Sequence, residues 1–381
     1  MNAPKLRFKE FTDEWIAIKL NDISKTFDYG MNVASTSFDG KNKYIRITDI
    51  DDVSHKFLKN NIVSPSGSLE DKYLVKNDDI LFARTGASTG KTYLYNSNDG
   101  ILYFAGFLIR INVLKSYNSY FIFQNTLTKK YTDWVKVESI RSGQPGINAE
   151  QYKSYSIKCP TLAEQNKIAN FLTTVDKKIT NLENTITSLE NQKKGLLQQI
   201  FSQKLRFKDK NGNNYPNWEK KKLGDILKIC HGKDYKNEPN EKKLYPVLGT
   251  GGIITYIDNF LCNWKCVLIG RKGTINKPQY METPFWSVDT LFYSKPKTKQ
   301  NPKFQYYLFQ NINWIKYDES TGVPSLSAST IENISFVLPC LEEQTKIADF
   351  LSAFDRKLEN QKAQLEHWQQ IKKGLLQQMF V

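Results

Sequence analysis

The stretch LAEQNKIANFL, from Leu162 to Leu172, opens a segment that closes with KKGLLQQIF at Lys193 to Phe201, and both pieces recur later in the chain. The second copy reads LEEQTKIADFL from Leu341 to Leu351 and KKGLLQQMF from Lys372 to Phe380. Matched residues lie 179 positions apart (341 minus 162), and no gap is needed. A repeat of this length is too large for a solenoid unit, so it indicates the duplication of a whole module.

Each copy carries a regular apolar stripe. Apolar residues recur at alternating steps of three and four, which is the spacing of a coiled-coil seam. We therefore expect two long helices, at 161–203 and 339–381, that cover each other as an antiparallel coiled coil; the alternative is that each helix packs only on its own domain. Polar Lys193, Gln361 and Lys372 interrupt the stripes. The predicted seam residues are Ile168, Leu172, Val175, Ile179, Leu182, Ile186, Leu189, Ile347, Leu351, Phe354, Leu358, Leu365 and Trp368.

The sequence outside these helices has few matched landmarks. LRFK occurs at Leu6–Lys9 and again at Leu205–Lys208, and a Gly-x-Pro segment precedes each helix, at 143–145 and 322–324. Between these landmarks the copies diverge almost completely. The predicted layout is a variable domain at 1–160, a helix, a second variable domain at 204–338, and a helix.

Both variable domains read as mainly β-structure with short helices, which makes the fold class α+β. In the first domain KYIRITDI, DILFAR and ILYFAGFLIRINV are rich in β-branched and aromatic residues, and we predict strands there. Residues 119–135 have the apolar spacing of an amphipathic helix. In the second domain we predict strands at YPVLG, CVLIGR and TLFYS and a helix at 304–315.

The composition favours a polyanionic partner. The 381 residues include 54 Lys and Arg against 39 Asp and Glu, a net charge of +15, which suggests DNA or RNA; the alternative is a lysine-rich solvated surface. No run approaches the ~18 consecutive apolar residues of a membrane span. The five cysteines follow no pairing pattern, as in a reducing compartment. We expect a cytoplasmic protein with no membrane partner.

Two loops have the form strand-Arg-x-Gly with a lysine downstream. TGASTGKT at Thr85–Thr92 lacks the first glycine of a phosphate-binding P-loop, which argues against ATP binding. Its counterpart is GRKGTINK at Gly270–Lys277. Arginine can bind guanine edges or phosphates, so we interpret the loops as DNA contacts, although glycines that serve only a hairpin turn would look alike. The candidate DNA-binding residues are Arg46, Thr48, Arg84, Thr85, Gly86, Ser88, Lys91, Arg141, Arg271, Lys272, Gly273, Thr274 and Lys277.

No group of residues has the pattern of a catalytic site. The three histidines lie apart from any serine or cysteine nucleophile pattern. Cys262 and Cys266, with Cys230 and His231, could form a zinc site, but buried structural cysteines are the more common explanation. We therefore predict no catalytic residue, no metal site and no cofactor on this chain.

The whole chain resembles the specificity (S) subunit of type I restriction-modification systems. The resemblance rests on KYIRITDI, DILFARTGASTGK, YPVLGTGGIITYI, VLIGRKGTINKP, PFWSVDTLFY, and helices that open P-x-L-x-E-Q-x-K-I-A and close KKGLLQQ-x-F. It implies two target-recognition domains that each read half of a split site in double-stranded DNA. It also implies that the two helices pair antiparallel, with pseudo-twofold symmetry, and bind two methyltransferase (M) subunits, and that restriction (R) subunits join the full complex. S-adenosylmethionine, ATP and magnesium would then belong to those partners.

Two other classes of function stay open on the sequence. One is a free-standing DNA- or RNA-binding adaptor with no enzyme partner. The other is a nucleotide-dependent enzyme that uses Thr85–Thr92.

Overall fold

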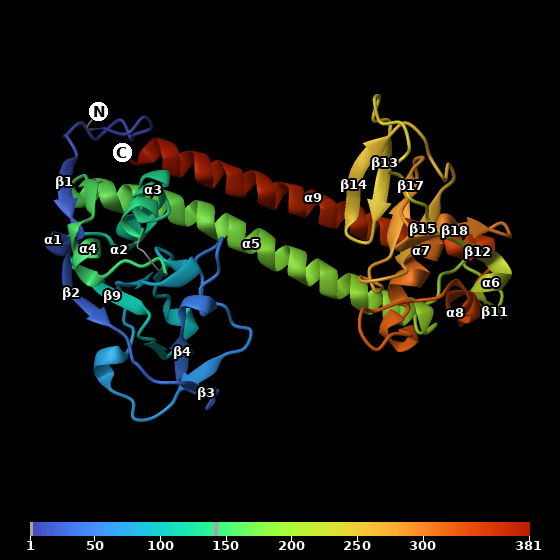
Figure 1. The fold of residues 1–381 in the computed structure, drawn as a ribbon, viewed down its shortest axis with the longest axis horizontal. Helices are drawn as coiled ribbons and strands as arrows, with labels where there is room; N and C mark the ends of the chain where they lie inside the picture. Colours follow the sequence, from blue (N-terminus) through green and yellow to red (C-terminus); the bar gives the residue numbers. More distant parts are fainter. Residues whose placement is uncertain (1–2, 141–143) are drawn as a thin grey trace. The chain divides into compact units, whose positions relative to one another are not determined.

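A computed structural model describes residues 3–140 and 144–381 of the chain. The chain forms two compact units. Unit 1 comprises Met1–Asn181 and Gln364–Val381, and unit 2 comprises Leu182–Ala363. The long helices α5 (Leu162–Phe201) and α9 (Leu341–Met379) each contribute residues to both units (Figure 1).

Unit 1 contains the first variable domain, called domain 1 below, which ends where α5 begins. Most of its strands are short. The strands are β1 (Ile16–Lys19), β2 (Ser24–Tyr29), β3 (Ser35–Ser37), β4 (Lys43–Ile45), β5 (Val63–Pro65), β6 (Asp79–Ala83), β7 (Thr92–Leu94), β8 (Leu102–Phe104), β9 (Leu108–Val113) and β10 (Ser156–Cys159), and the α-helices are α1 (Leu20–Ile23), α2 (Ser119–Asn125), α3 (Lys129–Glu138) and α4 (Ala149–Ser154).

Unit 2 contains the second variable domain, domain 2, between α5 and α9. Its strands are β11 (Glu219–Lys222), β12 (Leu227–Cys230), β13 (Tyr245–Gly249), β14 (Gly252–Ile257), β15 (Cys266–Gly270), β16 (Gln279–Met281), β17 (Trp286–Ser287), β18 (Leu291–Pro296) and β19 (Ser335–Leu338), and its α-helices are α6 (Leu223–Ile226), α7 (Pro302–Asn311) and α8 (Ala328–Asn333).

The two domains share one strand topology. An antiparallel sheet has the order β2-β9-β6-β7 in domain 1 and β12-β18-β15-β16 in domain 2. A two-stranded ladder joins the start of each domain to its last strand, as β1-β10 and as β11-β19. Each domain also has one parallel pair, β4-β8 or β13-β17. The duplication read from the helices therefore extends through domains whose sequences have diverged, and the predicted α+β class with two similar domains is confirmed.

Halves of the long helices pack together within each unit. In unit 1, Ile168 and Leu172 of α5 share a core with Leu376 of α9, and Figure 1 shows the C-terminal end of α9 beside the start of α5. In unit 2, α5 and α9 run antiparallel. Glu190 pairs with Lys362, and Lys193, which follows Glu190 in α5, pairs with Asp355, which precedes Lys362 in α9.

Most of the predicted seam is buried. The exceptions are Phe354, Leu365 and Trp368, which are half-buried. The buried members are Ile168, Leu172, Val175, Ile179, Leu182, Ile186, Leu189, Ile347, Leu351 and Leu358. Among the described residues no helix is long and apolar enough to cross a membrane.

The single helix predicted at 119–135 is wrong. The chain forms α2 and α3 there, separated by Thr126–Thr128. The Thr126 hydroxyl donates to the carbonyl of Phe123 at 2.7 Å, and Thr128 takes an extended backbone conformation and accepts the N–H of Tyr131. Threonine side chains that bond the backbone compete with helical hydrogen bonding, so the helix ends and restarts.

Two other predicted elements are shorter than expected. KYIRITDI forms a strand only at β4, and a 3₁₀ turn at Ile47–Asp49 follows. The helix predicted at 304–315 ends at Asn311, and a 3₁₀ turn starts at Trp314. The strands predicted at DILFAR and ILYFAGFLIRINV in domain 1, and at YPVLG, CVLIGR and TLFYS in domain 2, are present as β6, β8, β9, β13, β15 and β18.

Candidate nucleic-acid interface

Arg84 stands at the end of β6 and is held by backbone on both sides. Its N–H donates to the carbonyl of Phe107 at 3.0 Å, and its carbonyl accepts the N–H of Ile147 at 2.9 Å. The guanidinium carbon lies 4.9 Å from the ring centroid of Tyr29, within the range of a cation–π contact. Arg84 is half-buried and is therefore fixed in direction while part of its fork faces solvent.

Arg271 holds the same place at the end of β15 in domain 2. Its N–H donates to the carbonyl of Thr290 at 2.8 Å, and its carbonyl accepts the N–H of Leu326 at 2.9 Å. Nη1 contacts Oδ1 of Asp289 at 2.5 Å. That pair lies at the surface, adds little stability and occupies Nη1 of the guanidinium.

The glycine of each loop reaches the segment that precedes the long helix. Gly86 has a φ of +72° and donates its N–H to Pro145 at 2.9 Å, and Gly273 has a φ of +85° and donates to Pro324 at 2.8 Å. Glycine adopts this left-handed conformation without steric cost. The repeated Arg-x-Gly loops and the matched prolines Pro145 and Pro324 therefore lie together and form one platform in each domain, a junction that the sequence did not predict.

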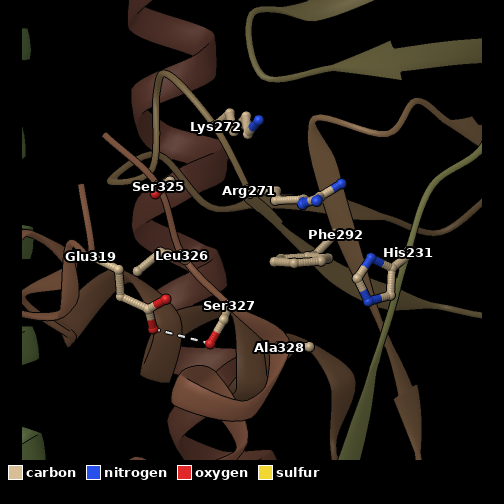
Figure 2. Close-up of a pocket in the computed structure, with 9 residues that line it drawn as sticks. All are labelled: His231, Arg271, Lys272, Phe292, Glu319, Ser325, Leu326, Ser327 and Ala328. Atoms are coloured by element: carbon tan, nitrogen blue, oxygen red, sulfur yellow. Dashed lines mark hydrogen bonds between the residues drawn. The ribbon is translucent and has the colours of Figure 1, made fainter. Parts of the chain in front are cut away.

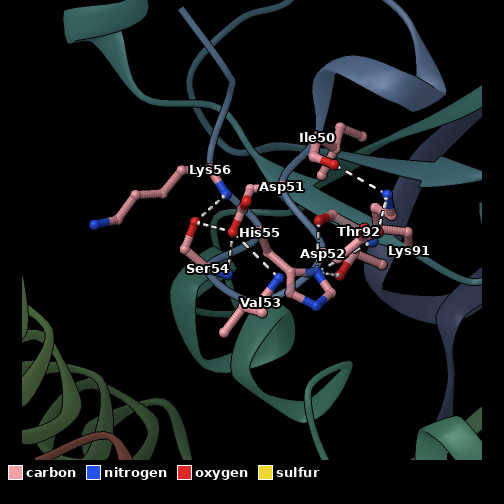
Figure 3. Close-up of polar contacts among 9 residues, drawn as sticks. All are labelled: Ile50, Asp51, Asp52, Val53, Ser54, His55, Lys56, Lys91 and Thr92. Atoms are coloured by element: carbon pink, nitrogen blue, oxygen red, sulfur yellow. Dashed lines mark hydrogen bonds and ion pairs between the residues drawn. The ribbon is translucent and has the colours of Figure 1, made fainter. Parts of the chain in front are cut away.

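The two downstream lysines differ. Lys91 points inward: its Nζ lies 3.0 Å from the carbonyl of Ile50 and pairs with Asp52 (Figure 3). Lys277 is exposed. Any contact between Lys91 and DNA would require its present partners to be released, whereas Lys277 meets solvent directly.

The other candidates are spread over both domains. Arg46 forms a two-pronged bond with Asp49, at 2.8 Å from Nε and 2.8 Å from Nη2. Arg141 lies outside the described residues. Thr48, Lys272 and Gly273 are exposed, Thr85, Ser88 and Thr274 are half-buried, and Gly86 is buried. The roles of these residues in DNA binding stay predictions.

The loop from Thr85 to Thr92 connects two antiparallel strands, β6 and β7. A P-loop leads from a strand into a helix whose N-terminus faces the phosphates, and only one 3₁₀ turn, Gly86–Ser88, is present here. The geometry therefore agrees with the interpretation as a hairpin loop.

Two cysteines of the zinc alternative, Cys262 and Cys266, are buried in domain 2, and the third, Cys230, is half-buried. The sulfur atoms of Cys262 and Cys266 lie 3.7 Å apart. The hydrogen bond with Cys262, together with burial, raises the pKa of the Cys266 thiol. Within the described part of the chain, no three His, Cys, Asp or Glu side chains are grouped so as to hold a metal ion.

A buried glutamate joins each domain to its long helix. Glu164 of α5 accepts two bonds from Arg7, at 2.7 Å and 2.8 Å, and one from the Trp15 indole at 3.3 Å. The repeat of LRFK is visible in the sequence, but the sequence gives it no role. We call this arrangement the glutamate clamp.

The glutamate clamp recurs in unit 2. Glu343 of α9 accepts bonds from Arg206 at 2.9 Å and 2.8 Å and from the Trp218 indole at 2.8 Å. The neighbouring glutamine adds a second link, because Gln344 accepts the N–H of Asn301 at 3.0 Å, as Gln165 does for Asn118. The repeated Glu-Gln pair thus fixes how each domain sits on its helix.

The lysines that interrupt the seam have matched partners. Lys193 pairs with Asp355 at 2.5 Å in unit 2, and Lys372 pairs with Asp176 at 2.8 Å in unit 1. Both aspartates lie 179 positions apart (355 minus 176), as do both lysines (372 minus 193). A tyrosine of the adjoining domain donates to each aspartate, and Tyr307 does so at 2.6 Å. The interruptions are therefore a duplicated polar network.

Comparison with known proteins shows which family has this architecture. The profile of the type I restriction modification DNA specificity domain family matches residues 12–191 and 215–367, one match for each copy of the module. The chain is 23% identical over 367 residues to the type I restriction enzyme MjaVIII specificity subunit of Methanocaldococcus jannaschii, with 85% of this chain and 83% of the relative covered. It is 23% identical over 418 residues to the putative MjaX specificity subunit of the same organism, with 98% and 95% covered.

Solved structures give the same fold. The S subunit of a type I restriction-modification system from M. genitalium aligns with a TM-score of 0.65 at 19% identity, with 100% of this chain and 99% of that chain covered. A chain from a study of complex assembly and conformational transition of the type I R-M system aligns with a TM-score of 0.54 at 13% identity, with 95% and 96% covered. With two family matches over most of its length, this chain belongs to the type I restriction-modification DNA specificity domain family and is built as a specificity subunit.

Proposed function

We propose that this chain reads a two-part site in double-stranded DNA, with one half-site for each domain. The observation that carries the proposal is the recurrence of the Arg-x-Gly platform at the same place in both domains although their sequences differ. A loop of this form can contact DNA in the same way in both domains, and the divergent residues around it can then make the two half-sites different. The net charge of +15 supports a salt-sensitive attraction to DNA.

The long helices would set the distance between the two half-sites. α5 has 40 residues and α9 has 39, which at the rise of an α-helix gives a length of roughly 60 Å. The glutamate clamps support this role, because each clamp joins one domain to its helix through charge-assisted bonds. Paired readers on a rigid support bind half-sites only at a fixed separation and helical phase, as readers one turn of DNA (~34 Å) apart do.

We further propose that the chain is not itself an enzyme and acts through partners. Two methyltransferase subunits would bind the helices, and restriction subunits would complete the assembly. S-adenosylmethionine, ATP and magnesium would be held by those partners. The family membership and the absence of a catalytic pattern in the sequence support this assignment.

The test is a binding titration with the purified full-length chain. Fluorescence anisotropy with a labelled duplex should give an affinity that falls as salt rises, with a slope that reports the number of phosphates neutralised. The same preparation should neither methylate DNA from S-adenosylmethionine nor cut it. Methyl transfer or cleavage by the chain alone would overturn the non-enzymatic assignment, and an absence of DNA binding at low salt would overturn the proposal.

A further inference from the structure

Tyr29 in domain 1 and His231 in domain 2 lie at equivalent positions beside the Arg-x-Gly platforms. In domain 1, Tyr29 at the end of β2 pairs across the sheet with Ile109, which on its other side pairs with Phe82. In domain 2 the corresponding central residue is Phe292, opposite Ile269. The ladder of β12 and β18 ends at Cys230 opposite Tyr293, so one step further along places His231 opposite Phe292.

The next residue confirms this equivalence. Tyr29 and His231 are each followed by a glycine whose Cα lies against backbone. A Cβ on Gly30 would meet the carbonyl oxygen of Ala105 at 2.2 Å, and one on Gly232 would meet that of Val288 at 2.0 Å. Both positions require glycine for the same reason, so the preceding residues present their side chains at matching places.

In domain 1 the side chain of Tyr29 fills the space beside the platform. The ring of Tyr29 lies beneath the guanidinium of Arg84, and its hydroxyl accepts the N–H of Ala149 at 3.2 Å. The tyrosine therefore spans the space between the platform arginine and the start of α4. It holds both elements and leaves its outer edge exposed.

Domain 2 leaves the same place open. His231 is exposed and contacts Phe292 edge-to-face, with 4.9 Å between the ring centroids. Between His231, Arg271 and the segment before α8 lies a pocket of about 260 Å³ (Figure 2). This volume is below the ~300–1,000 Å³ of sites for drug-sized ligands, but it suits the edge of a single base.

The lining of the pocket combines donors with acceptors. Arg271 and Lys272 supply donors, and the two ring nitrogens of His231 add further hydrogen-bonding groups. Glu319 supplies a carboxylate on the opposite wall, where Ser327 donates to it at 3.0 Å. A phosphate group would be repelled by that carboxylate. A base edge in the major groove presents both donors and acceptors and matches the mixed lining.

We propose that His231 is a specificity-determining residue of domain 2, and that with Arg271 it reads the edge of one base of the second half-site in this pocket. Tyr29 fills the corresponding place in domain 1, so the two domains differ at one matched position. The inference rests on the proposed DNA-binding function and names the residues by which one half-site is read.

The test uses the full-length chain and a library of random DNA duplexes, from which bound molecules are recovered and sequenced. Three proteins are compared with the wild type. His231→Ala removes the ring. His231→Tyr introduces the side chain that domain 1 carries, whose hydroxyl can reach Ala328 as that of Tyr29 reaches Ala149. His367→Ala, which removes an exposed histidine of α9, is the control. Thermal melts establish that all variants are folded.

We expect the wild type and His367→Ala to select the same two-part motif. Both changes at His231 should relax the preference at one position of one half-site, by roughly 5- to 150-fold, and leave the other half-site unchanged. Identical motifs and relative affinities for all proteins would overturn the inference and leave the DNA-binding function standing. An equal loss of affinity for every sequence would point to a phosphate contact and would also overturn it. If the wild type selects no motif, the proposed function itself fails.

Discussion

Replacing Glu343 by glutamine tests the glutamate clamp of unit 2. The carboxylate is fully buried and accepts three hydrogen bonds, two from Arg206 and one from the indole of Trp218. Glutamine has nearly the same shape but only one acceptor oxygen, and its amide N–H₂ would face the donors of Arg206. The substitution therefore removes the ion pair and takes the carboxylate partner away from at least one of the three N–H donors.

The magnitude follows from the geometry. Hydrogen bonds to charged groups contribute about 1.5–3 kcal/mol each, and the loss is moderated here because the side chain of Arg206 is 25% exposed and its charge stays partly solvated. We expect a loss of about 2–3 kcal/mol from the free energy of unfolding of unit 2, out of ~5–15 kcal/mol for a typical domain. For a unit of this size the loss corresponds to a drop of roughly 4–12 °C in Tm.

The assay is thermal unfolding of the full-length chain, combined with hydrogen exchange resolved by peptide. The control is Glu342→Gln, which removes the same charge from the exposed neighbouring position. Exchange should accelerate in unit 2 for Glu343→Gln, and in unit 1 for the matched Glu164→Gln. If Glu343→Gln and Glu342→Gln melt at the same temperature, the clamp does not hold the domain and the reasoning is refuted.

Three further outcomes are expected. Arg84→Glu and Arg271→Glu should each weaken DNA binding about tenfold or more and disturb mainly one half-site, and unchanged anisotropy titrations with folded protein would argue against the platforms. Burial lowers the pKa of His55, so as pH falls below about 6.5 the unfolded chain binds a proton at this histidine before the folded chain does. The free energy of unfolding of unit 1 should therefore decrease from that pH down to the lower pKa of the folded state. In urea titrations at several pH values, His55→Asn should reduce this decrease. Lys193→Met should lower the free energy of unfolding of unit 2 by about 1–3 kcal/mol, because Asp355 loses its cation. Adding Asp355→Asn in a double-mutant cycle should recover part of that loss, and additive changes would show that the two side chains are not coupled.

The long helices and the two-domain layout could be predicted because their signals are local. A seam at alternating steps of three and four requires only neighbouring residues, and the repeat at Leu162 and Leu341 fixes its register. The error at residues 119–135 has the opposite cause. The apolar spacing there continues through Thr126–Thr128, but hydroxyl bonds to the backbone end the first helix, and apolar spacing does not detect such bonds.

The interface could be predicted only in part. The Arg-x-Gly loops recur close to a strand end and are visible in the sequence. The clamp between Arg7 and Glu164 joins residues far apart in the chain, and only the repetition of LRFK and Glu-Gln gave a signal of it. Lys193 was noted as an interruption of the seam, but its partner Asp355 could not be found without the antiparallel packing of the helices in unit 2.

The most direct test of the account is methylome sequencing of a host that carries this chain together with its methyltransferase partner. We predict methylation at one motif made of two short specified halves separated by a gap of fixed length, and we predict that deleting the gene for this chain abolishes that methylation. Exchanging domain 2 for that of a relative should change one half of the motif and keep the gap. Methylation at an uninterrupted motif, or methylation that persists without this chain, would contradict the account.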